Sequence, residues 1–390
     1  MLHIEEDMCR QKPLRILALV AEAYGGRGGI AQSTRDLLSA LSEFHWVSEI
    51  EILPRIVREA GVQLPNGIMQ HGAVNGRVDY SRKALWLAVT RCPDLIYCGH
   101  AFMTPLAYLA ARVASAQLVS HVHGLEVWEP LSPFVRRALA ASDLILCVSR
   151  HTVGKVVDTA GADPDRCAAI FNTVDDRFTP GDRAAARARF GIAPEATVLS
   201  AVARLDPRQR HKGHDRVIPL LADLARDVPG LTYLVAGTGG DRERLEALAR
   251  NTGAGGIVRF LGFVSDEDLP DLYRASDLYV MPSHGEGFGI AFVEAMCCGT
   301  PALGLNAGGA GDALRHGELG RAVAVADFPA ALRTAILAPP IDRAALAARS
   351  RAAFGRPAFA ARLAEATAPL LPGHAGARHR TTGPRPPCRF

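Results

Sequence analysis

Two glutamates set eight positions apart in a glycine-rich stretch are the clearest chemical signal in this 390-residue sequence. Residues 283–301 read SHGEGFGIAFVEAMCCGTP, with Glu286 among the glycines and Glu294 in the apolar run that follows. An apolar strand is expected just before them, at 278–281, and a helix is expected to begin at 288–290. The free backbone N–H groups at such a helix start form a cradle for an anion. The groups concerned belong to Gly287, Phe288, Gly289 and Ile290.

The two carboxylates need a partner other than the anion, because both would repel it if they pointed into its site. They are well suited to accept hydrogen bonds from neutral hydroxyls, such as those of a sugar, on either side of a phosphate. Alternatively, Glu286 is an ordinary acid at a helix N-terminus and Glu294 is a solvated helix carboxylate. The surrounding glycines favour the binding site.

A basic pair follows a second expected strand, at 197–202. Arg204 lies just past that strand, and Lys212 follows eight residues later beside a glycine. Lys212 is one of only four lysines among 44 basic residues. A compact point charge on a phosphate explains a lysine in a chain that otherwise uses arginine; chance is the alternative. Together the two cations could neutralise a diphosphate leaving group without a metal ion.

A histidine lies at the end of a strand in the first half of the chain. His123 follows the expected strand at 118–122, and His121 lies on the same face of that strand. His123 is nearer the strand end, where ligands of parallel sheets bind. A structural histidine with its hydrogen bonds satisfied is the alternative interpretation.

Two glycine-rich turns also follow expected strands, at residues 25–29 and 237–240. Glycine lets the backbone approach a ligand closely, and a helix N-terminus behind it favours anions. Each turn is therefore a candidate ligand contact. Neither turn has the full G-x-G-x-x-G spacing, so a plain tight turn stays open for both.

Metal signatures are sparse in the sequence. The D-x-D pairs at 163–165 and 266–268 are interpreted as a turn and as a helix cap that begins at Ser265. There is no H-E-x-x-H motif and no Walker A loop. We expect no metal ion and no cofactor.

The order of apolar runs and helical stretches predicts an α/β protein with parallel sheets. One series of strands is expected at 15–20, 94–97, 118–122 and 144–148, and a second at 197–202, 232–236, 258–261, 278–281 and 301–305. This predicts two doubly wound domains that divide near residues 172–180. The Pro/Gly-bounded, Arg/Ala-rich stretch at 178–196 is a candidate hinge.

The net charge of +4 does not indicate a nucleic-acid partner. Residues 373–390 hold four arginines and no acidic residue, which leaves 40 basic and 40 acidic residues in the rest. The body therefore has no basic field for a polyphosphate. We expect this tail to be disordered.

The eight scattered cysteines are interpreted as thiols, and no secretory signal or membrane-spanning run is recognised. A cytoplasmic location is expected.

The stretch at 77–92 carries basic residues around leucines, Trp86 and Val89, as a helix on the inner membrane surface would. An ordinary core-facing helix is the alternative.

The motif Glu286-Gly-Phe-Gly-(x)4-Glu294 resembles the E-x7-E motif of retaining glycosyltransferases of family 4, which have the GT-B fold. The resemblance extends over about residues 14–371. Residues 28–31 are similar to the family's first glycine loop, 123–124 to its histidine and 172–178 to its domain junction. Arg204 and Lys212 are similar to its diphosphate-binding pair, and 261–264 to its loop beside the nucleotide base.

The resemblance implies a role for each matching position. Glu286 would bind hydroxyls of the transferred sugar, Glu294 would bind the ribose, and His123 would lie at the reacting face; His123 and Glu286 are the catalytic candidates. The amides of 287–290 and of Gly28 and Gly29 would contact sugar and phosphate. Phe263 and Val264 would contact the nucleobase. The leaving diphosphate would help to deprotonate the acceptor.

Two departures from the family pattern affect these assignments. The segment from Arg204 to Lys212 is longer than usual, so Arg208 or Arg210 could share or replace the role of Lys212. After the motif, residues 308–312 have Gly and Asp where the family more often has Pro and Glu, which bears on sugar selectivity.

The resemblance implies two Rossmann-like domains that face each other across a cleft. The acceptor-side domain comprises residues 14–175 and is completed by a helix at 357–371, and the donor-side domain comprises 176–356. The expected activity is retaining, metal-independent transfer of a hexose from a nucleotide-diphosphate sugar to a glycan or polyprenyl-diphosphate-linked acceptor, in bacterial polysaccharide or glycolipid assembly. The alternatives are a non-catalytic sugar-nucleotide-binding protein and a nicotinamide-dependent oxidoreductase.

Overall fold

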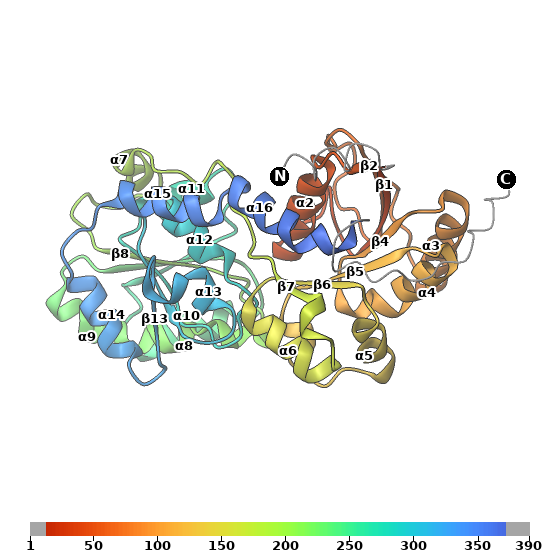
Figure 1. The fold of residues 1–390 in the computed structure, drawn as a ribbon. Coiled ribbons are helices and arrows are strands. Elements are labelled where there is room, and N and C mark those ends of the chain that lie inside the picture. Colours follow the sequence, from red (N-terminus) through yellow and green to blue (C-terminus); the bar gives the residue numbers. More distant parts are fainter. Residues whose placement is uncertain (1–12, 372–390) are drawn as a thin grey trace. The chain divides into compact units, whose positions relative to one another are not determined.

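The computed structural model describes residues 13–371, which form two compact units (Figure 1). Within this range, unit 1 comprises residues 13–172 and 359–371, and unit 2 comprises Thr173–Ala358. The boundaries expected from the sequence, after residues 175 and 356, lie close to these positions. The expected disordered tail at 373–390 lies outside the described residues.

Unit 1 is built on a seven-stranded parallel sheet with the strand order β3-β2-β1-β4-β5-β6-β7. The order reverses between β1 and β4, and such a switch point is where doubly wound sheets bind ligands. The strands are β1 (Leu14–Val20), β2 (Val47–Pro54), β3 (Ile68–Gln70), β4 (Leu95–Cys98), β5 (Gln117–Val122), β6 (Leu144–Cys147) and β7 (Cys167–Ala169). Its helices are α2 (Gly29–Ser42), α3 (Arg77–Arg91), α4 (Thr104–Ala114), α5 (Pro133–Ala140), α6 (Arg150–Ala160) and most of α16 (Arg356–Thr367).

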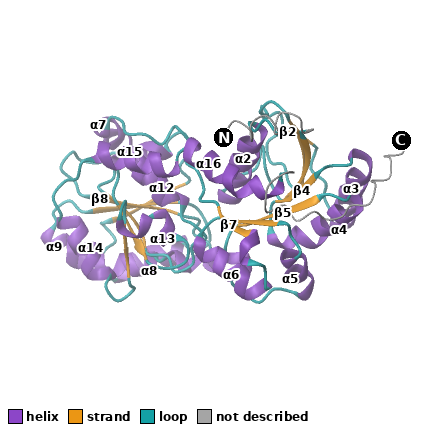
Figure 2. Ribbon diagram, in the orientation of Figure 1, coloured by secondary structure: helices purple, strands orange, loops and turns teal. Residues whose placement is uncertain are grey.

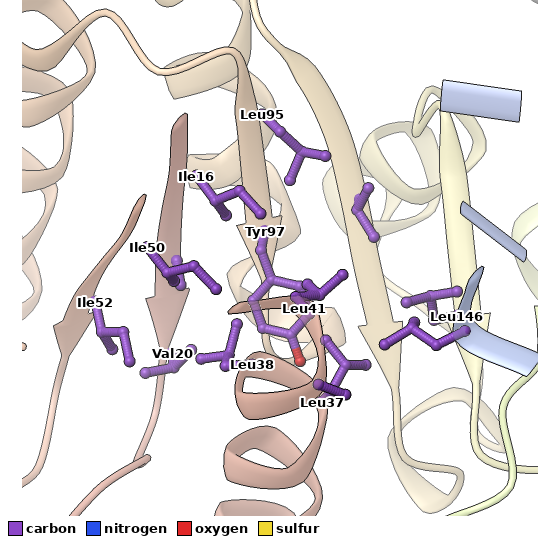
Figure 3. Close-up of a cluster of buried hydrophobic side chains, with 14 of the residues drawn as sticks. Ile16, Val20, Leu37, Leu38, Leu41, Ile50, Ile52, Leu95, Tyr97 and Leu146 are labelled. Atoms are coloured by element: carbon purple, nitrogen blue, oxygen red, sulfur yellow. The ribbon is translucent and has the colours of Figure 1, made fainter. Parts of the chain in front are cut away.

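Helices cover both faces of this sheet (Figure 2). On one face, Leu37 and Leu41 of α2 pack with Tyr97 against the strands (Figure 3). Phe359 and Leu363 of α16 join the same cluster, so the end of the chain completes the core of unit 1. Tyr97, Leu37 and Leu363 are fully buried, and this apolar burial stabilises the sheet from which the site loops project.

Unit 2 is built on a six-stranded parallel sheet with the strand order β10-β9-β8-β11-β12-β13. Its order reverses between β8 and β11. The strands are β8 (Val198–Val202), β9 (Thr232–Ala236), β10 (Val258–Gly262), β11 (Leu278–Met281), β12 (Ala302–Leu305) and β13 (Arg321–Val323). The helices are α7 (Arg183–Arg189), α8 (His214–Val217), α9 (Leu221–Asp227), α10 (Arg242–Asn251), α11 (Leu269–Ala275), α12 (Ile290–Cys297), α13 (Ala310–Ala313), α14 (Phe328–Leu337) and α15 (Arg343–Phe354).

The prediction of two doubly wound α/β domains is confirmed, and every strand expected from the sequence is present. The sequence analysis missed four strands, β2, β3, β7 and β13. The candidate hinge at 178–196 is wrong as a linker, because it contains α7 and belongs to unit 2. Asp182 caps α7, and the buried side chain of Arg187 bonds Asp277 at 2.8 Å. Alanine and arginine are strong helix formers, which explains this helix.

The interpretation of all cysteines as thiols is wrong for Cys92, which is disulfide-bonded. Five others are free and lie in the described part of the chain: Cys98, Cys147, Cys167, Cys297 and Cys298.

No helix among residues 13–371 combines the length and apolar character needed to cross a membrane.

Candidate active site

The N-terminus of α12 is the centre of the candidate site in unit 2. The helix begins at Ile290, as predicted, and Gly289 before it has φ of +96°. A Cβ at Gly289 would press on the Phe292 ring and approach the side chain of Glu286. No side chain of the described residues caps this helix. Phe292 N donates to Gly289 O at 3.0 Å, and the helix amides that precede Phe292 lie before the first helical acceptor, so they suit an anion.

Lys212 and Glu286, which are far apart in the sequence, meet at this helix start. Lys212 Nζ donates to Glu286 Oε2 at 2.7 Å, and both side chains are largely buried. Two glycines allow the approach: a Cβ at Gly213 would clash with the carbonyl of Pro282, and one at Gly285 would clash with the His211 ring. The ion pair therefore links the expected phosphate cation to the expected sugar carboxylate.

The arginines near Lys212 differ in what they bind. Arg208 pairs with Asp206 at 2.9 Å and Arg210 pairs with Asp241 at 3.2 Å. The exposed Arg204 makes no hydrogen bond or ion pair with any residue in the described part of the chain. Arg204 is therefore the cation here whose guanidinium is free to bind a ligand, whereas Arg208 and Arg210 would first have to leave a carboxylate.

The glycine turn at 237–240 fits closely against the segment that carries Arg204. A Cβ at Gly237 would clash with the carbonyl of Ala203, and one at Gly239 would clash with that of Leu205. Leu205 N donates to Thr238 O at 2.9 Å. Backbone packing thus accounts for these glycines, and the turn holds the Arg204 segment against the sheet.

Glu294 lies on the second turn of α12, in the apolar run that follows the glycines. Its Oε2 accepts a hydrogen bond of 2.8 Å from the hydroxyl of Tyr273 on α11. Burial raises the pKa of Glu294 to about 7, although the Tyr273 hydrogen bond opposes this. The carboxyl therefore titrates near neutral pH.

The remaining candidate residues of unit 2 differ in how exposed their side chains are. Phe263 follows β10 and is 71% exposed, so its ring is free to stack on a planar group. Val264 packs partly against the core of unit 2. Phe288 is buried, and its ring lies 5.7 Å from that of Phe354, so its side chain is packed inside the fold.

In unit 1, His121 and His123 lie side by side but in different surroundings. The rings are 4.3 Å apart. His121 is buried, with Nδ1 2.7 Å from the Tyr97 hydroxyl, whereas His123 is half-buried and its Nε2 donates to Gly99 O at 2.9 Å. Burial lowers the pKa of both, so both are neutral at pH 7. With Nε2 donating, Nδ1 of His123 is the ring nitrogen that can accept.

The first glycine loop opens α2, also in unit 1. Gly28 has φ of +92°, and a Cβ at Gly28 or Gly29 would meet no atom within 4 Å. No side chain of the described residues caps the helix behind them. The space beside these glycines and the uncapped helix start suit the close approach of an anion.

The two D-x-D pairs take part in local structure. Asp163 accepts from the Asp165 amide at 3.1 Å, and Ser265 accepts from the Asp268 amide at 3.1 Å, as expected for a cap. Across residues 13–371 there is no group of three His, Cys, Asp or Glu side chains that could hold a metal ion.

Sequence reasoning missed two residues, Tyr273 and Asp241, that bond other residues of the candidate site. Tyr273 bonds Glu294, and buried Asp241 bonds both Arg210 and Arg244. Tyr273 lies 21 residues from Glu294 in the sequence, and Asp241 lies 31 residues from Arg210, so these two contacts could not be read from spacing. Asp312, in the segment 308–312 that departs from the family pattern, is buried, and its Oδ1 lies 3.4 Å from His316 Nε2.

Comparison with known proteins identifies the family. Residues 27–178 match Glycosyltransferase Family 4, and residues 182–363 match Glycosyl transferases group 1. The chain belongs to the group 1, family 4 glycosyltransferases. The two matches meet at residues 178–182, close to the division between the units after residue 172. Membership of this family does not favour the nicotinamide-dependent oxidoreductase.

Curated relatives of this family member include two named D-inositol 3-phosphate glycosyltransferase. The one from Rhodococcus jostii is 34% identical over 63% of this chain and 56% of its own length, and the one from Geodermatophilus obscurus is 39% identical over 51% and 47%. The chain thus spans about half the length of the curated relatives that it matches.

Solved structures show the same GT-B fold at low sequence identity. Anabaena HepE in complex with UDP matches with a TM-score of 0.72 and 22% identity, covering 92% of this chain and all of that one. The lipopolysaccharide glycosyltransferase WaaG matches with a TM-score of 0.67 and 18% identity, again over 92% of this chain and all of that one. The predicted fold class is confirmed.

Proposed function

We propose that this chain transfers a hexose from a nucleotide-diphosphate sugar to a glycan or polyprenyl-diphosphate-linked acceptor, with retention of the anomeric configuration and without a metal ion. The observation that carries the proposal is the Lys212–Glu286 ion pair at the uncapped start of α12. It places a cation, a hydroxyl acceptor and free amides at one point.

Each group has a role in this reaction. The α12 amides, Lys212 and Arg204 bind the diphosphate and stabilise its negative charge as the bond to the sugar breaks. Glu286 orients hydroxyls of the transferred sugar, and Glu294 accepts from the ribose. The freed phosphate oxygen takes the proton of the acceptor hydroxyl, which attacks from the same face. His123, neutral at pH 7, contacts the sugar through Nδ1, and Gly28 and Gly29 contact phosphate.

The names of related proteins support this choice of donor. HepE has been solved with UDP and with UDP-glucose, although its low identity to this chain establishes the fold alone. The inositol phosphate in the names of the curated relatives makes D-inositol 3-phosphate an acceptor to include in any screen.

We also propose a peripheral contact with the cytoplasmic face of the inner membrane, through α3. Trp86 and Val89 on this helix are 57% and 56% exposed, and Arg82 and Lys83 lie beside them. An apolar strip flanked by cations suits an anionic lipid surface.

A two-stage experiment tests the proposed reaction. UDP- and GDP-sugars are screened for protection against thermal unfolding, since a bound donor raises the midpoint by mass action. The stabilising donor is then incubated with acceptors, with and without EDTA, and the anomeric proton of the product is read by NMR. A retained anomer in both conditions supports the proposal. An inverted product, or loss of turnover in EDTA restored by metal, contradicts it; binding without transfer to any acceptor or water favours the sugar-nucleotide-binding alternative.

A further inference from the structure

Glu294 is held by a rigid neighbour. Tyr273 is fully buried, with its ring 5.6 Å from Tyr279 and 6.0 Å from Phe178, so its hydroxyl has little freedom to move. This hydroxyl donates to Glu294 Oε2 at 2.8 Å. A carboxylate bonded in this way has one oxygen fixed by the fold.

The second carboxylate oxygen of Glu294 is uncommitted. Oε1 has no hydrogen-bond partner among residues 13–371, and the Glu294 side chain is only partly buried. A fixed carboxylate with one open oxygen is an acceptor prepared for a ligand hydroxyl, because the orientation is set before the ligand arrives.

We propose that Tyr273 is a positioning residue: it fixes Oε2 of Glu294 so that Oε1 accepts from the ribose hydroxyls of the donor nucleotide. This inference rests on the proposed function, because it takes the ligand of Glu294 to be a nucleotide. It adds a residue that neither motif spacing nor strand position indicates.

The charges around Glu294 give this arrangement a pH signature. Burial is the main reason that its pKa rises to about 7, and nearby Asp266 and Asp175 raise it further. The Tyr273 hydrogen bond and the charge of Arg177 lower it. Cys297 and Cys298, whose own pKa values are raised by burial, stay neutral on the same helix. The ionised carboxylate is the stronger acceptor, so recognition of ribose increases as the pH rises through this pKa.

The first test compares nucleotides with and without ribose hydroxyls. Affinities for UDP and GDP, and for their 2′,3′-dideoxy counterparts, are measured by calorimetry. The wild-type chain is expected to prefer the ribose form about tenfold at pH 8, as for a hydrogen bond to a charged group. Tyr273→Phe should lose most of that preference. Tyr279→Phe, at a buried tyrosine that makes no hydrogen bond to Glu294, should keep it.

The second test follows the same preference from pH 5.5 to 9. Tyr273→Phe should move the midpoint of the profile to higher pH, because the hydroxyl that favours the ionised carboxylate is gone. Placing 3-fluorotyrosine at position 273 keeps the ring and strengthens the donor, so it should move the midpoint to lower pH. This second substitution decides the question if Tyr273→Phe does not fold.

The outcomes separate this inference from the function on which it rests. If the wild-type chain binds neither UDP nor GDP, the proposed function fails. If it binds one of them without preferring ribose, or if Tyr273→Phe keeps both the preference and the midpoint, the positioning role is overturned and nucleotide binding stands. An unmoved midpoint with 3-fluorotyrosine also overturns the positioning role.

Discussion

Lys212 Nζ lies 2.7 Å from Glu286 Oε2, at the point where the amides of α12 are uncapped. The lysine cancels the charge of a carboxylate that would otherwise repel a phosphate from these amides. The pair also holds the carboxylate in one orientation. This contact explains how Glu286, in its proposed role as a sugar-binding acid, could lie beside the proposed anion site without repelling the anion.

Removing Lys212 should weaken donor binding more than it affects the fold. Lys212→Ala takes a cation from the phosphate and leaves Glu286 as an uncompensated charge beside it. We expect the KM of Lys212→Ala for the donor to be at least tenfold higher than that of the wild type, and the KM of Lys212→Arg to lie between these two values. Lys155→Ala, in unit 1, is the control. Steady-state kinetics measure this; an unchanged KM in Lys212→Ala would exclude a phosphate role.

Arg204 and Arg208 should respond differently to truncation. Arg204 has no carboxylate partner in the described chain, whereas Arg208 pairs with Asp206. Arg204→Ala should reduce the affinity for a nucleoside diphosphate about tenfold and flatten its dependence on salt. Arg208→Ala should change it by less than about twofold. Calorimetry at two ionic strengths checks this, and the reverse order would show that Arg208 is the phosphate ligand.

Glu294 should make the protein less stable as the pH rises. Its folded pKa of about 7 exceeds the ordinary value of 4.5, so the folded state binds more protons between these values. This contribution is fully present below pH 4.5 and is lost as the pH rises through 7. Between pH 4.5 and pH 8, the free energy of unfolding of Glu294→Gln should therefore increase by about 2–3 kcal/mol relative to that of the wild type. Denaturant unfolding of both proteins at the two pH values tests this. The prediction is refuted if the difference in free energy of unfolding between the variant and the wild type does not change with pH.

Alanine at two glycines should separate a ligand contact from a packing contact. Gly29→Ala adds a methyl group in open space, so the unfolding midpoint should stay the same while turnover falls if a ligand comes close there. Gly237→Ala places a methyl group against the Ala203 carbonyl at φ of +140° and should lower the unfolding midpoint clearly. Thermal unfolding with a transfer assay distinguishes them; full activity in Gly29→Ala would remove this loop from the site.

The α3 surface should bind anionic vesicles. Trp86→Glu should abolish co-sedimentation with phosphatidylglycerol vesicles, because it replaces the largest exposed apolar side chain of the helix with a charge. Leu337→Glu, at an exposed apolar position in unit 2, is the matched control. If the wild-type chain does not sediment with these vesicles, the membrane contact is wrong.

The sequence predicts those strands that are continuous apolar runs buried on both faces. β9 and β11 have the expected bounds for this reason. β2 was missed because Ser48, Glu49 and Glu51 interrupt its pattern, and Glu51 lies inside the fold because His71 bonds it at 2.6 Å. β13 has only three residues, which are too few to show the apolar pattern by which a strand is recognised in a sequence.

In the candidate site, too, the sequence predicts the local features but not the contacts between distant residues. The start of α12 follows from the glycines before an apolar run, which local conformation alone explains. The partners do not follow from spacing: Lys212 meets Glu286, and Tyr273 meets Glu294, only because separate loops and helices of unit 2 come together. The sequence left open whether Arg208 or Arg210 shares or replaces the role of Lys212, and in the fold each of these two arginines pairs with a carboxylate.

The most direct test of the central claim is the transfer rate of Glu286→Gln, measured with the donor found in the thermal screen and compared with its affinity for the matching nucleoside diphosphate. The account predicts that transfer falls at least a hundredfold, because the amide cannot replace the charged acceptor beside Lys212, while the nucleotide still binds and the fold is unchanged. Wild-type turnover in this folded variant would contradict it.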